Sequence, residues 1–522
     1  MTTRRDIENA LMRGADSLRD TLDAANYKDY VLPVMFFKYL SDSYEDEVDK
    51  LVTKYKGDRN RLERQKKYLP FTIAEEISYK KLFAERRSDN LGQLINMTLR
   101  KIEDDNHQQL AGVLSAVDYN SETNLGTREH KNAILRDLLE DFIGLDLRPS
   151  QIEVKENQVP ADVIGDAYEY MIGEFAGMAG KKAGSFYTPA AVSEIMARIV
   201  DAQSGEQVYD PTCGSGSLLI KAAKRQPKNQ IAIYGQEVNG SSVSMAKMNM
   251  YIHEINDAHI TWGDTLANPL FLDTDGNLMH FDAIVANMPF SKDKWAAGFN
   301  SGSEAAGRGR KEFKMEASMD KYHRFDWCVP PASKGDWAFL LHMIASCAHG
   351  GRIAAVAPHG VLFRSGAEGI IRRRVIDENI LDAVIGLPEN VFFGTSIPAC
   401  ILVFKKDRKN KDVVFIDAGK KDEQGNLRYI KGKNQNILTE KNIGDIVGAY
   451  KKRKNVEKFV YAASIKEIQD NEYNLNIPRY VDTFEEEELI DIEEVQQNIK
   501  RLKAEITKAE AKMDGYLKEL GL

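Results

Sequence analysis

The sequence lacks the features of a secreted or membrane protein. Its four cysteines, Cys213, Cys328, Cys347 and Cys400, are scattered and show no C-x-x-C spacing, so no disulfide framework is expected. Charged residues interrupt every hydrophobic run early, so the sequence predicts neither a signal peptide nor a membrane span. No residue pattern predicts a metal site. We therefore expect a cytoplasmic protein.

An excess of positive charge is also missing. The 71 Lys and Arg residues are outnumbered by 79 Asp and Glu residues, giving a net charge of −8. A free-standing DNA-binding protein usually has the opposite balance. Three local basic clusters occur at 308–311, 372–374 and 451–454, and such clusters are more often solvated faces than phosphate contacts.

The pattern of the chain predicts several regions. Its 522 residues, of which 43% are apolar, suffice for more than one core. Residues 1–150 are charged with helical apolar spacing, which predicts a helical N-terminal domain. Residues 151–418 alternate strands with helices, which predicts an α/β catalytic domain with a mainly parallel sheet and helices on both faces. Residues 419–484 would form a C-terminal connecting region, and 485–522 a helix.

The last helix has the clearest periodicity in the chain. Its apolar residues alternate in steps of three and four, which is a heptad pattern and favours coiled-coil packing. The alternative is an amphipathic helix that lies on its own domain. The residues of the pattern are Ile492, Val495, Ile499, Leu502, Ile506, Ala509, Met513, Tyr516 and Leu520.

A polar pocket with an aromatic wall is predicted where the apolar run 281–286 ends in Asn287-Met288-Pro289-Phe290. The Asn287 side-chain oxygen and the Met288 carbonyl could accept the two N–H bonds of an exocyclic or amide nitrogen, directing its lone pair at a methyl donor. Phe290 would stack on the planar substrate and tolerate developing positive charge. An ordinary strand-to-turn exit remains the alternative.

A glycine loop precedes this motif. The short strand 207–209 is followed by Asp210, then by Gly214 and Gly216, and by the helical stretch 218–224. Glycines between a strand and a helix let a ligand approach the helix N-terminus closely. The loop lacks the Lys-Ser/Thr ending of a phosphate loop and is not G-x-G-x-x-G. Asp210 is placed to meet a cationic or amine-bearing ligand.

Two further acids end successive strands. Glu237 follows the strand 231–236, where an acid can bind both ribose hydroxyls. Asp264 follows the segment 259–263 and could accept a hydrogen bond from an adenine amino group. Each acid alone could be a solvated loop residue. Three acids that end separate strands in order favour a nucleoside-binding site.

Together these motifs resemble those of S-adenosylmethionine-dependent methyltransferases that methylate amino groups in DNA. A further match is Gly184-Ser-Phe186-Tyr187-Thr188-Pro189, a segment that in this group packs over the methionine end of the cofactor. The order of the motifs matches the adenine-N6 branch. The resemblance implies the class I S-adenosylmethionine-dependent methyltransferase fold, with S-adenosyl-L-methionine as cofactor. The cofactor-binding residues it implies are Phe186, Tyr187, Thr188, Pro189, Asp210, Thr212, Gly214, Ser215, Gly216, Glu237 and Asp264.

The resemblance narrows to the modification subunit of type I restriction-modification systems and covers nearly the whole chain. Further segments occur in the order expected of that family, at 27–40, 336–342, 351–363, 398–404 and 473–480. One departure lies in the catalytic motif, where the family normally has two prolines and Met288 replaces the first. Met288 can supply the required carbonyl, but without the fixed φ of proline that carbonyl is less firmly held.

Such a subunit is an adenine-specific DNA methyltransferase (EC 2.1.1.72) that acts on an adenine extracted from double-stranded DNA. The resemblance implies that a separate specificity subunit supplies sequence recognition, usually with two modification subunits bound to one specificity subunit. A motor-nuclease restriction subunit would join them for cleavage. The helix from Ile492 would meet the specificity subunit, and the Gly-, Ser- and Lys-rich stretch between Phe290 and Lys334 could close over DNA.

Two alternatives remain open from the sequence. Methyltransferases that act on glutamine amides of proteins also use an Asn-Pro-Pro-aromatic motif, although the long helical N-terminus and the heptad tail argue against this reading. Because of Met288, the chain could also be a catalytically weak assembly scaffold of a defence complex. Methyl transfer to DNA distinguishes the type I subunit from both alternatives.

Overall fold

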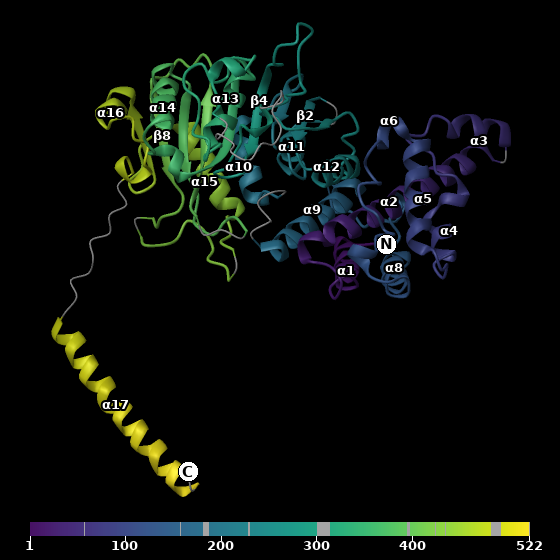
Figure 1. The fold of residues 1–522 in the computed structure, drawn as a ribbon, viewed down its shortest axis with the longest axis horizontal. Coiled ribbons are helices and arrows are strands. Elements are labelled where there is room, and N and C mark those ends of the chain that lie inside the picture. Colours follow the sequence, from purple (N-terminus) through teal and green to yellow (C-terminus); the bar gives the residue numbers. More distant parts are fainter. Residues whose placement is uncertain are drawn as a thin grey trace, which may run out of the picture. The chain divides into compact units, whose positions relative to one another are not determined.

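The computed structural model describes residues 1–56, 58–156, 158–180, 187–227, 230–299, 314–393, 397–422, 424–433, 435–481 and 492–520. The chain divides into two compact units, Met1–Val481 and Asp482–Leu522 (Figure 1). Among the helices of the described residues, none has the length and apolar character needed to cross a membrane.

The N-terminal part of the first unit is helical, as its apolar spacing predicts. Its core is contiguous, and the buried residues Phe36, Ile164 and Tyr168 belong to one hydrophobic cluster. This core includes residues of α9, beyond residue 150. The domain boundary at residue 150 stays a prediction. The helices are α1 (Arg4–Asp16), α2 (Tyr27–Tyr55), α3 (Arg59–Lys66), α4 (Tyr79–Ala84), α5 (Leu91–Asp105), α6 (His107–Leu110), α7 (Glu122–Leu125), α8 (Arg128–Ile143) and α9 (Pro160–Ala179).

A nine-stranded sheet forms the centre of the remainder of this unit. Its last strand, β9, lies beyond residue 418, so the region predicted as a connection contributes to the sheet. The strands are β1 (Gln207–Asp210), β2 (Ala232–Glu237), β3 (His259–Trp262), β4 (Phe281–Asn287), β5 (Cys347–Pro358), β6 (Leu381–Gly386), β7 (Ala399–Lys405), β8 (Asp412–Asp417) and β9 (Val460–Ser464).

The strand order is β3-β2-β1-β4-β5-β7-β6-β8-β9. The first five strands in this order are parallel to one another. β7 is antiparallel to both β5 and β6, and β9 is antiparallel to β8. The predicted α/β class with a mainly parallel sheet is confirmed.

Helices cover both faces of the sheet. Alternate residues of each strand point to opposite sides, so apolar strands present two faces that the helices bury. In β4, Ala283 and Val285 belong to one hydrophobic cluster, whereas Ile284 and Ala286 belong to another. The first cluster includes residues of α10 (Ala190–Val200), α11 (Ser217–Ala223) and α15 (Glu440–Lys452). The second includes residues of α13 (Asp336–Ala345), α14 (Ala367–Asp377) and α16 (Ile465–Asp470).

Helix α12 (Gly240–Ile252) joins the helical core to the sheet. Its residues Val243 and Ala246 are buried in a core of the sheet. On another side, Met245, Met248 and Ile252 are buried with the N-terminal helices. Figure 1 shows α12 beside α9 and α2, with the strands on its other side. The helical part therefore packs directly on the element that follows β2.

The second unit contains one described helix, α17 (Ile492–Glu519). The sequence predicted this helix from its heptad pattern. Considered by itself, the unit leaves Ile499, Leu502, Ile506 and Met513 about half exposed. Coiled-coil packing of these residues stays a prediction.

Candidate active site

The predicted polar residues gather at the carboxyl edge of the sheet. Asp210 ends β1, Glu237 ends β2 and Asn287 ends β4, while Asp264 lies two residues beyond β3. These four strands are parallel and adjacent, so their carboxyl ends meet at one edge. Open α/β sheets bind ligands at this edge.

A narrow cavity at this edge brings together several of the predicted residues. It is lined by Tyr187, Thr188, Asp210, Thr212, Gly214, Ser215 and Asn287, together with Cys213, Ser217 and Leu218. Pro189, Gly216, Glu237, Asp264 and the last three residues of the catalytic motif are not among its lining residues. The predicted cofactor residue Phe186 lies outside the described residues.

Asp210 places a buried carboxyl group in the cavity. Its Oδ1 atom accepts a hydrogen bond of 2.9 Å from the Thr212 N–H. Its Oδ2 atom is buried and has no hydrogen-bond partner among the described residues. Burial raises the pKa of Asp210 from 3.8 to about 8, and the charge of Glu237 adds to this rise. A buried carboxylate oxygen without a partner suits a ligand that carries a cation or an N–H donor.

The glycine loop is held by Glu237. The Gly214 N–H donates to Glu237 Oε2 over 3.1 Å, and the Asn239 N–H donates to Oε1 over 2.8 Å. Gly214 and Gly216 have φ angles of +52° and +79°, which glycine adopts without strain. Burial raises the pKa of Glu237. The acid therefore connects the loop after β1 to the loop after β2.

Asp264 shapes the loop after β3. Its Oδ1 atom accepts hydrogen bonds from the Leu266 and Ala267 N–H groups, over 2.9 and 3.2 Å. The side chain is half-buried. Nearby, at the ends of β2 and β3, Val238 and Trp262 are 53% and 69% exposed. These exposed apolar side chains next to the acids were not singled out from the sequence.

The catalytic motif contacts the segment before α10. The Asn287 side-chain amide donates to Thr188 Oγ over 3.0 Å, and among the described residues none donates a hydrogen bond to its Oδ1 atom. Met288 is only 1% exposed and packs in a core of the sheet. Pro289 is exposed, and Phe290 is half-buried against the ring of Phe392, with centroids 6.0 Å apart.

A buried arginine that the sequence analysis missed supports this edge. Arg324 donates to the Thr265 and Leu266 carbonyls, over 3.3 and 2.6 Å, and pairs with Asp320 at 2.8 Å. It also contacts His342 Nδ1 at 3.1 Å. Arg324 therefore anchors the loop that carries Asp264. The sequence contains no local signal of this contact, because Arg324 follows that loop by about sixty residues.

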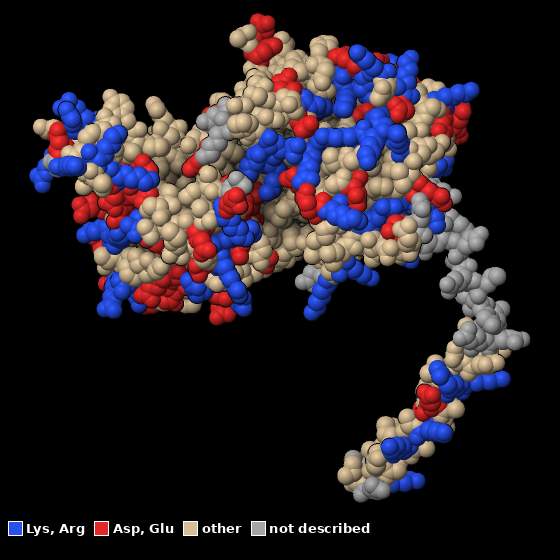
Figure 2. Space-filling view, turned by 180° about the vertical axis from the view of Figure 1, so that it is seen from behind, with Lys and Arg blue, Asp and Glu red and all other residues tan. Residues whose placement is uncertain are grey.

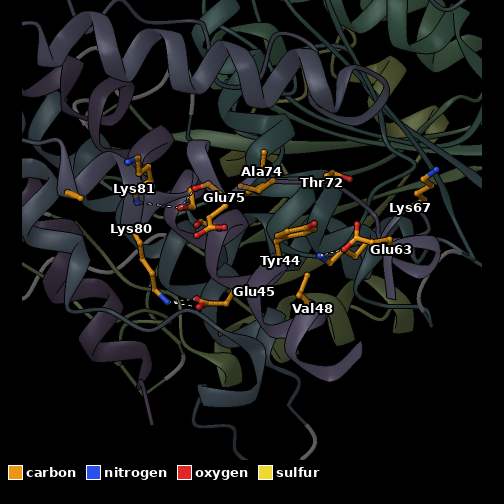
Figure 3. Close-up of a pocket in the computed structure, with 15 residues that line it drawn as sticks. Tyr44, Glu45, Val48, Glu63, Lys67, Thr72, Ala74, Glu75, Lys80 and Lys81 are labelled. Atoms are coloured by element: carbon orange, nitrogen blue, oxygen red, sulfur yellow. Dashed lines mark hydrogen bonds and ion pairs between the residues drawn. The ribbon is translucent and has the colours of Figure 1, made fainter. Parts of the chain in front are cut away.

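A larger cavity lies among the N-terminal helices (Figure 3). It measures about 730 Å³ and its lining includes Tyr44, Val48 and Ile73. Lys80 pairs with Glu45 at its edge, at 2.5 Å. None of the predicted site residues contributes to it, so its size alone does not make it a candidate active site.

The basic clusters differ in their surroundings. The 308–311 cluster lies outside the described residues. The interpretation as a solvated face is wrong for Arg372, which is buried and donates to the Tyr473, Val361 and Arg364 carbonyls. Arg372 therefore connects α14 to the segment before this helix and to Tyr473. Figure 2 shows Lys and Arg interspersed with Asp and Glu on the visible face, as the modest net charge suggests.

Known proteins resemble this chain over almost its full length. Residues 159–489 match the family model "N-6 DNA Methylase", and residues 7–142 match "HsdM N-terminal domain". The chain is 30% identical to the type I restriction enzyme MpnII methylase subunit of Mycoplasma pneumoniae, covering 95% of this chain and 93% of that protein. It is also 30% identical to the MjaVIII methylase subunit of Methanocaldococcus jannaschii, covering 98% and 84%.

A solved structure extends this likeness to the fold. The crystal structure of the type I restriction-modification system methyltransferase subunit from Streptococcus thermophilus superposes with a TM-score of 0.75. The sequences are 36% identical, and the match covers 92% of this chain and 100% of that one. The predicted methyltransferase fold is therefore confirmed.

Proposed function

The chain belongs to the N-6 DNA methylase family, among the methylase subunits of type I restriction enzymes, and from this premise we propose that it methylates adenine N6 in DNA. The observation that carries the proposal is that Asn287 lines the same cavity as Asp210, Thr212 and Ser215. Direct methyl transfer requires the target amino group and the cofactor to meet in one place. Because the proposed substrate is DNA, we expect the protein in the cytoplasm.

The acids that end the strands at this edge of the sheet suit S-adenosyl-L-methionine as the proposed cofactor. The unpartnered Asp210 Oδ2 would accept from its amino group or lie near its positive sulfur, and Glu237 would bind the ribose hydroxyls. Asp264 would accept a hydrogen bond from the amino group of the cofactor's own adenine ring, beside the apolar surface of Val238 and Trp262. When bound, the cofactor supplies a methyl group activated by the positive charge of its sulfur.

Asn287 would hold the target adenine. With its amide nitrogen donating to Thr188, the Asn287 oxygen is left to accept one N–H of the target amino group. The Met288 carbonyl would accept the other. Both contacts withdraw the nitrogen lone pair from conjugation and direct it at the methyl carbon. As the nitrogen bonds to the methyl carbon and the carbon–sulfur bond breaks, the positive charge would move from the sulfur to the nitrogen. The nitrogen would keep this charge until it loses a proton to water, and the Phe290 ring face would stabilise it.

The burial of Met288 could compensate for the proline that the family motif normally has at this position. Proline holds a backbone carbonyl through its fixed φ. Met288 is instead anchored by burial: it is 1% exposed and belongs to the same hydrophobic core as Ile284 and Trp295. Packing of this kind fixes the backbone of a residue that lacks the ring. This burial supports a catalytic subunit over the scaffold alternative.

The substrate and partners complete the proposal. The target adenine has to leave the duplex, because its amino group is otherwise paired. None of the described segments forms a separate base-reading domain, so we propose that a specificity subunit supplies the sequence recognition. The apolar face of α17 would bind helices of that subunit, with two modification subunits per specificity subunit. A motor-nuclease subunit would join for cleavage.

Mass spectrometry of nucleosides tests the activity directly. The chain, co-expressed with the specificity subunit of its own system, should convert adenine to N6-methyladenine in duplex DNA. Asn287→Ala should abolish transfer and leave cofactor affinity within about twofold, because Asn287 contacts the target base. The control Asn60→Ala changes an exposed residue of α3 and should be fully active.

Other products would contradict the proposal. N4-methylcytosine alone, or no methylated base with the intact complex, would exclude adenine N6 as the target. Methylated glutamine in a protein substrate would favour the glutamine-amide alternative. The relatives of this chain do not favour the glutamine-amide alternative, because they include type I methylase subunits that match nearly its full length.

A further inference from the structure

The chain turns sharply directly after the catalytic motif. Ser291 has a φ of +49° and Lys294 a φ of +52°, both in the left-handed region. Residues with a Cβ atom adopt this region only at an energetic cost. Such strained residues persist where surrounding contacts hold them, and they cluster at functional sites. The contacts that hold this turn therefore bear on the placement of the motif.

Asp336 provides the first contact. The Ser291 N–H donates to Asp336 Oδ1 over 2.6 Å. Asp336 is fully buried and is the first residue of α13. A hydrogen bond from an amide to a carboxylate is stronger than one between neutral groups. The left-handed residue is thus tied to a helix that packs in the core of the sheet.

Neighbours of Asp336 hold the same turn. The Gly335 N–H donates to the Lys292 carbonyl over 3.0 Å, and the Lys294 N–H donates to the Ala332 carbonyl over 3.0 Å. A Cβ atom on Gly335 would lie 3.0 Å from Trp295 Cβ, so a glycine permits this close approach. The turn and the start of α13 therefore form one hydrogen-bonded assembly.

Arg364 orients Asp336 from the other side. Its Nη1 atom lies 2.9 Å from Asp336 Oδ2 and 3.3 Å from Glu368 Oε1. A Cβ atom on Gly360 would lie 2.2 Å from the Arg364 guanidinium, so this glycine leaves room for it. Both oxygens of Asp336 are engaged, which fixes the plane of its carboxylate.

We propose that Asp336 is a positioning residue for the catalytic motif. By holding Ser291 in its left-handed conformation, it fixes the direction of the backbone from Asn287 to Phe290, and Arg364 fixes Asp336. This inference rests on the proposed function, because the direction of the motif matters to a target base bound there. The proposed cofactor residues Asp210, Glu237 and Asp264 hydrogen-bond to groups outside this assembly, so a change at Asp336 should leave them in place.

Asp336→Asn tests the inference in the complex with the specificity subunit. The amide keeps one acceptor oxygen but sets an NH₂ group against either Arg364 or the Ser291 N–H. In single-turnover methylation of duplex DNA, the transfer rate should fall roughly 10- to 100-fold, the size expected for a misplaced catalytic group. Affinity for S-adenosylmethionine, measured by calorimetry, should stay within about twofold.

Asp382→Asn is the matched control. Asp382 is also buried and ion-paired, with Arg453 Nη1 at 2.9 Å, but it lies at the amino end of β6, away from the motif. Both variants are compared well below their melting temperatures. Asp382→Asn should transfer methyl at the wild-type rate. An equal loss of rate in this control would overturn the inference, because the loss of any buried ion pair would then be enough to slow methyl transfer.

A rescue variant tests the route through Ser291. Glycine adopts positive φ without strain, so Ser291→Gly should be active by itself and should restore several-fold of the lost rate in Asp336→Asn. A double variant as slow as Asp336→Asn would overturn this route, as would Asp336→Asn at the wild-type rate. If the wild-type complex forms no methyladenine, the proposed function fails instead.

Discussion

At the scale of single residues, Asp210 carries the main electrostatic cost of the site. It is completely buried, and one of its oxygens has no hydrogen-bond partner in the part of the chain that the structure describes. A group with a raised pKa destabilises the folded protein progressively as the pH rises from its ordinary pKa toward the folded one. Here that window runs from 3.8 to about 8. The cofactor-free protein therefore keeps an unfavourable group in a place where a cationic ligand would compensate it.

Asp210→Asn should restore the stability that the cofactor-free protein loses when this buried carboxyl group ionises. The amide retains an oxygen for the Thr212 N–H but cannot ionise. We expect the cofactor-free variant to melt at a higher temperature than the wild type near pH 8, and the difference to shrink toward pH 4. Differential scanning calorimetry across this range measures it. Equal melting curves at both pH values would contradict the assigned burial cost.

The same residue links cofactor binding to protons. Because the ionised form of Asp210 would bind the cationic cofactor, binding below pH 8 should release a proton. Cofactor affinity should therefore rise by up to about tenfold per pH unit between pH 6 and pH 8. Isothermal titration calorimetry in buffers of different ionisation enthalpy detects the proton. Asp210→Asn should bind weakly and without this pH dependence.

At the scale of elements, α17 exposes a regular apolar face. Ile499, Leu502 and Ile506 are each about half exposed in the unit considered by itself. Such a stripe with charged flanks suits another helix in a coiled coil. Every described residue assigned to the cofactor lies in the other unit, Met1–Val481. Binding of a partner and binding of the cofactor should therefore be separable.

Deletion from Ile492 onward should leave a folded protein that binds S-adenosylmethionine normally. It should lose stable association with the specificity subunit, and with it site-specific methylation. Leu502→Glu within the apolar face should weaken the same association, whereas the adjacent off-face change Lys503→Glu should not. Size-exclusion chromatography of the co-expressed complexes measures this. Co-elution of the deleted chain at full strength would disprove the role of α17.

At the scale of the whole molecule, the helical part and the catalytic part share a core. Met245, Met248 and Ile252 of α12 are buried against the N-terminal helices. The start of the same helix follows Glu237, which holds the glycine loop. A further contact runs from Ser244 Oγ to the Gly112 carbonyl, over 2.9 Å. The N-terminal helices therefore pack on the helix that follows Glu237 and stabilise its position at the carboxyl edge of the sheet.

Removal of residues 1–158 should consequently unfold the catalytic part. Exposure of Met245, Met248 and Ile252 alone costs roughly 5–9 kcal/mol at about 1.5–3 kcal/mol per side chain. That approaches the entire stability of a typical domain, about 5–15 kcal/mol. Circular dichroism and cofactor titration of the truncated chain measure the outcome. A soluble, cooperatively melting fragment with wild-type cofactor affinity would show that the two parts are independent.

Much of the fold and of the candidate site follows from local sequence patterns. Short apolar runs that end at Asp210, Glu237 and Asn287 predict strands, and parallel strands bring their carboxyl ends to one edge. The glycines after Asp210 predict the turn into α11 in the same way. The heptad pattern predicts α17 without any tertiary information. These features depend on residues adjacent in the chain, so a single sequence contains them.

The remaining features depend on residues that only packing brings together. Asp336 meets Ser291 across 45 positions, and Arg324 meets the loop of Asp264 from about sixty residues away. The unpartnered Asp210 oxygen is likewise a property of its surroundings, because a carboxylate at a strand end is ordinarily solvated. The sequence thus determined which residues stand at the edge of the sheet. The tertiary structure decided which contacts hold them there, since burial and partner distance arise only when distant segments pack.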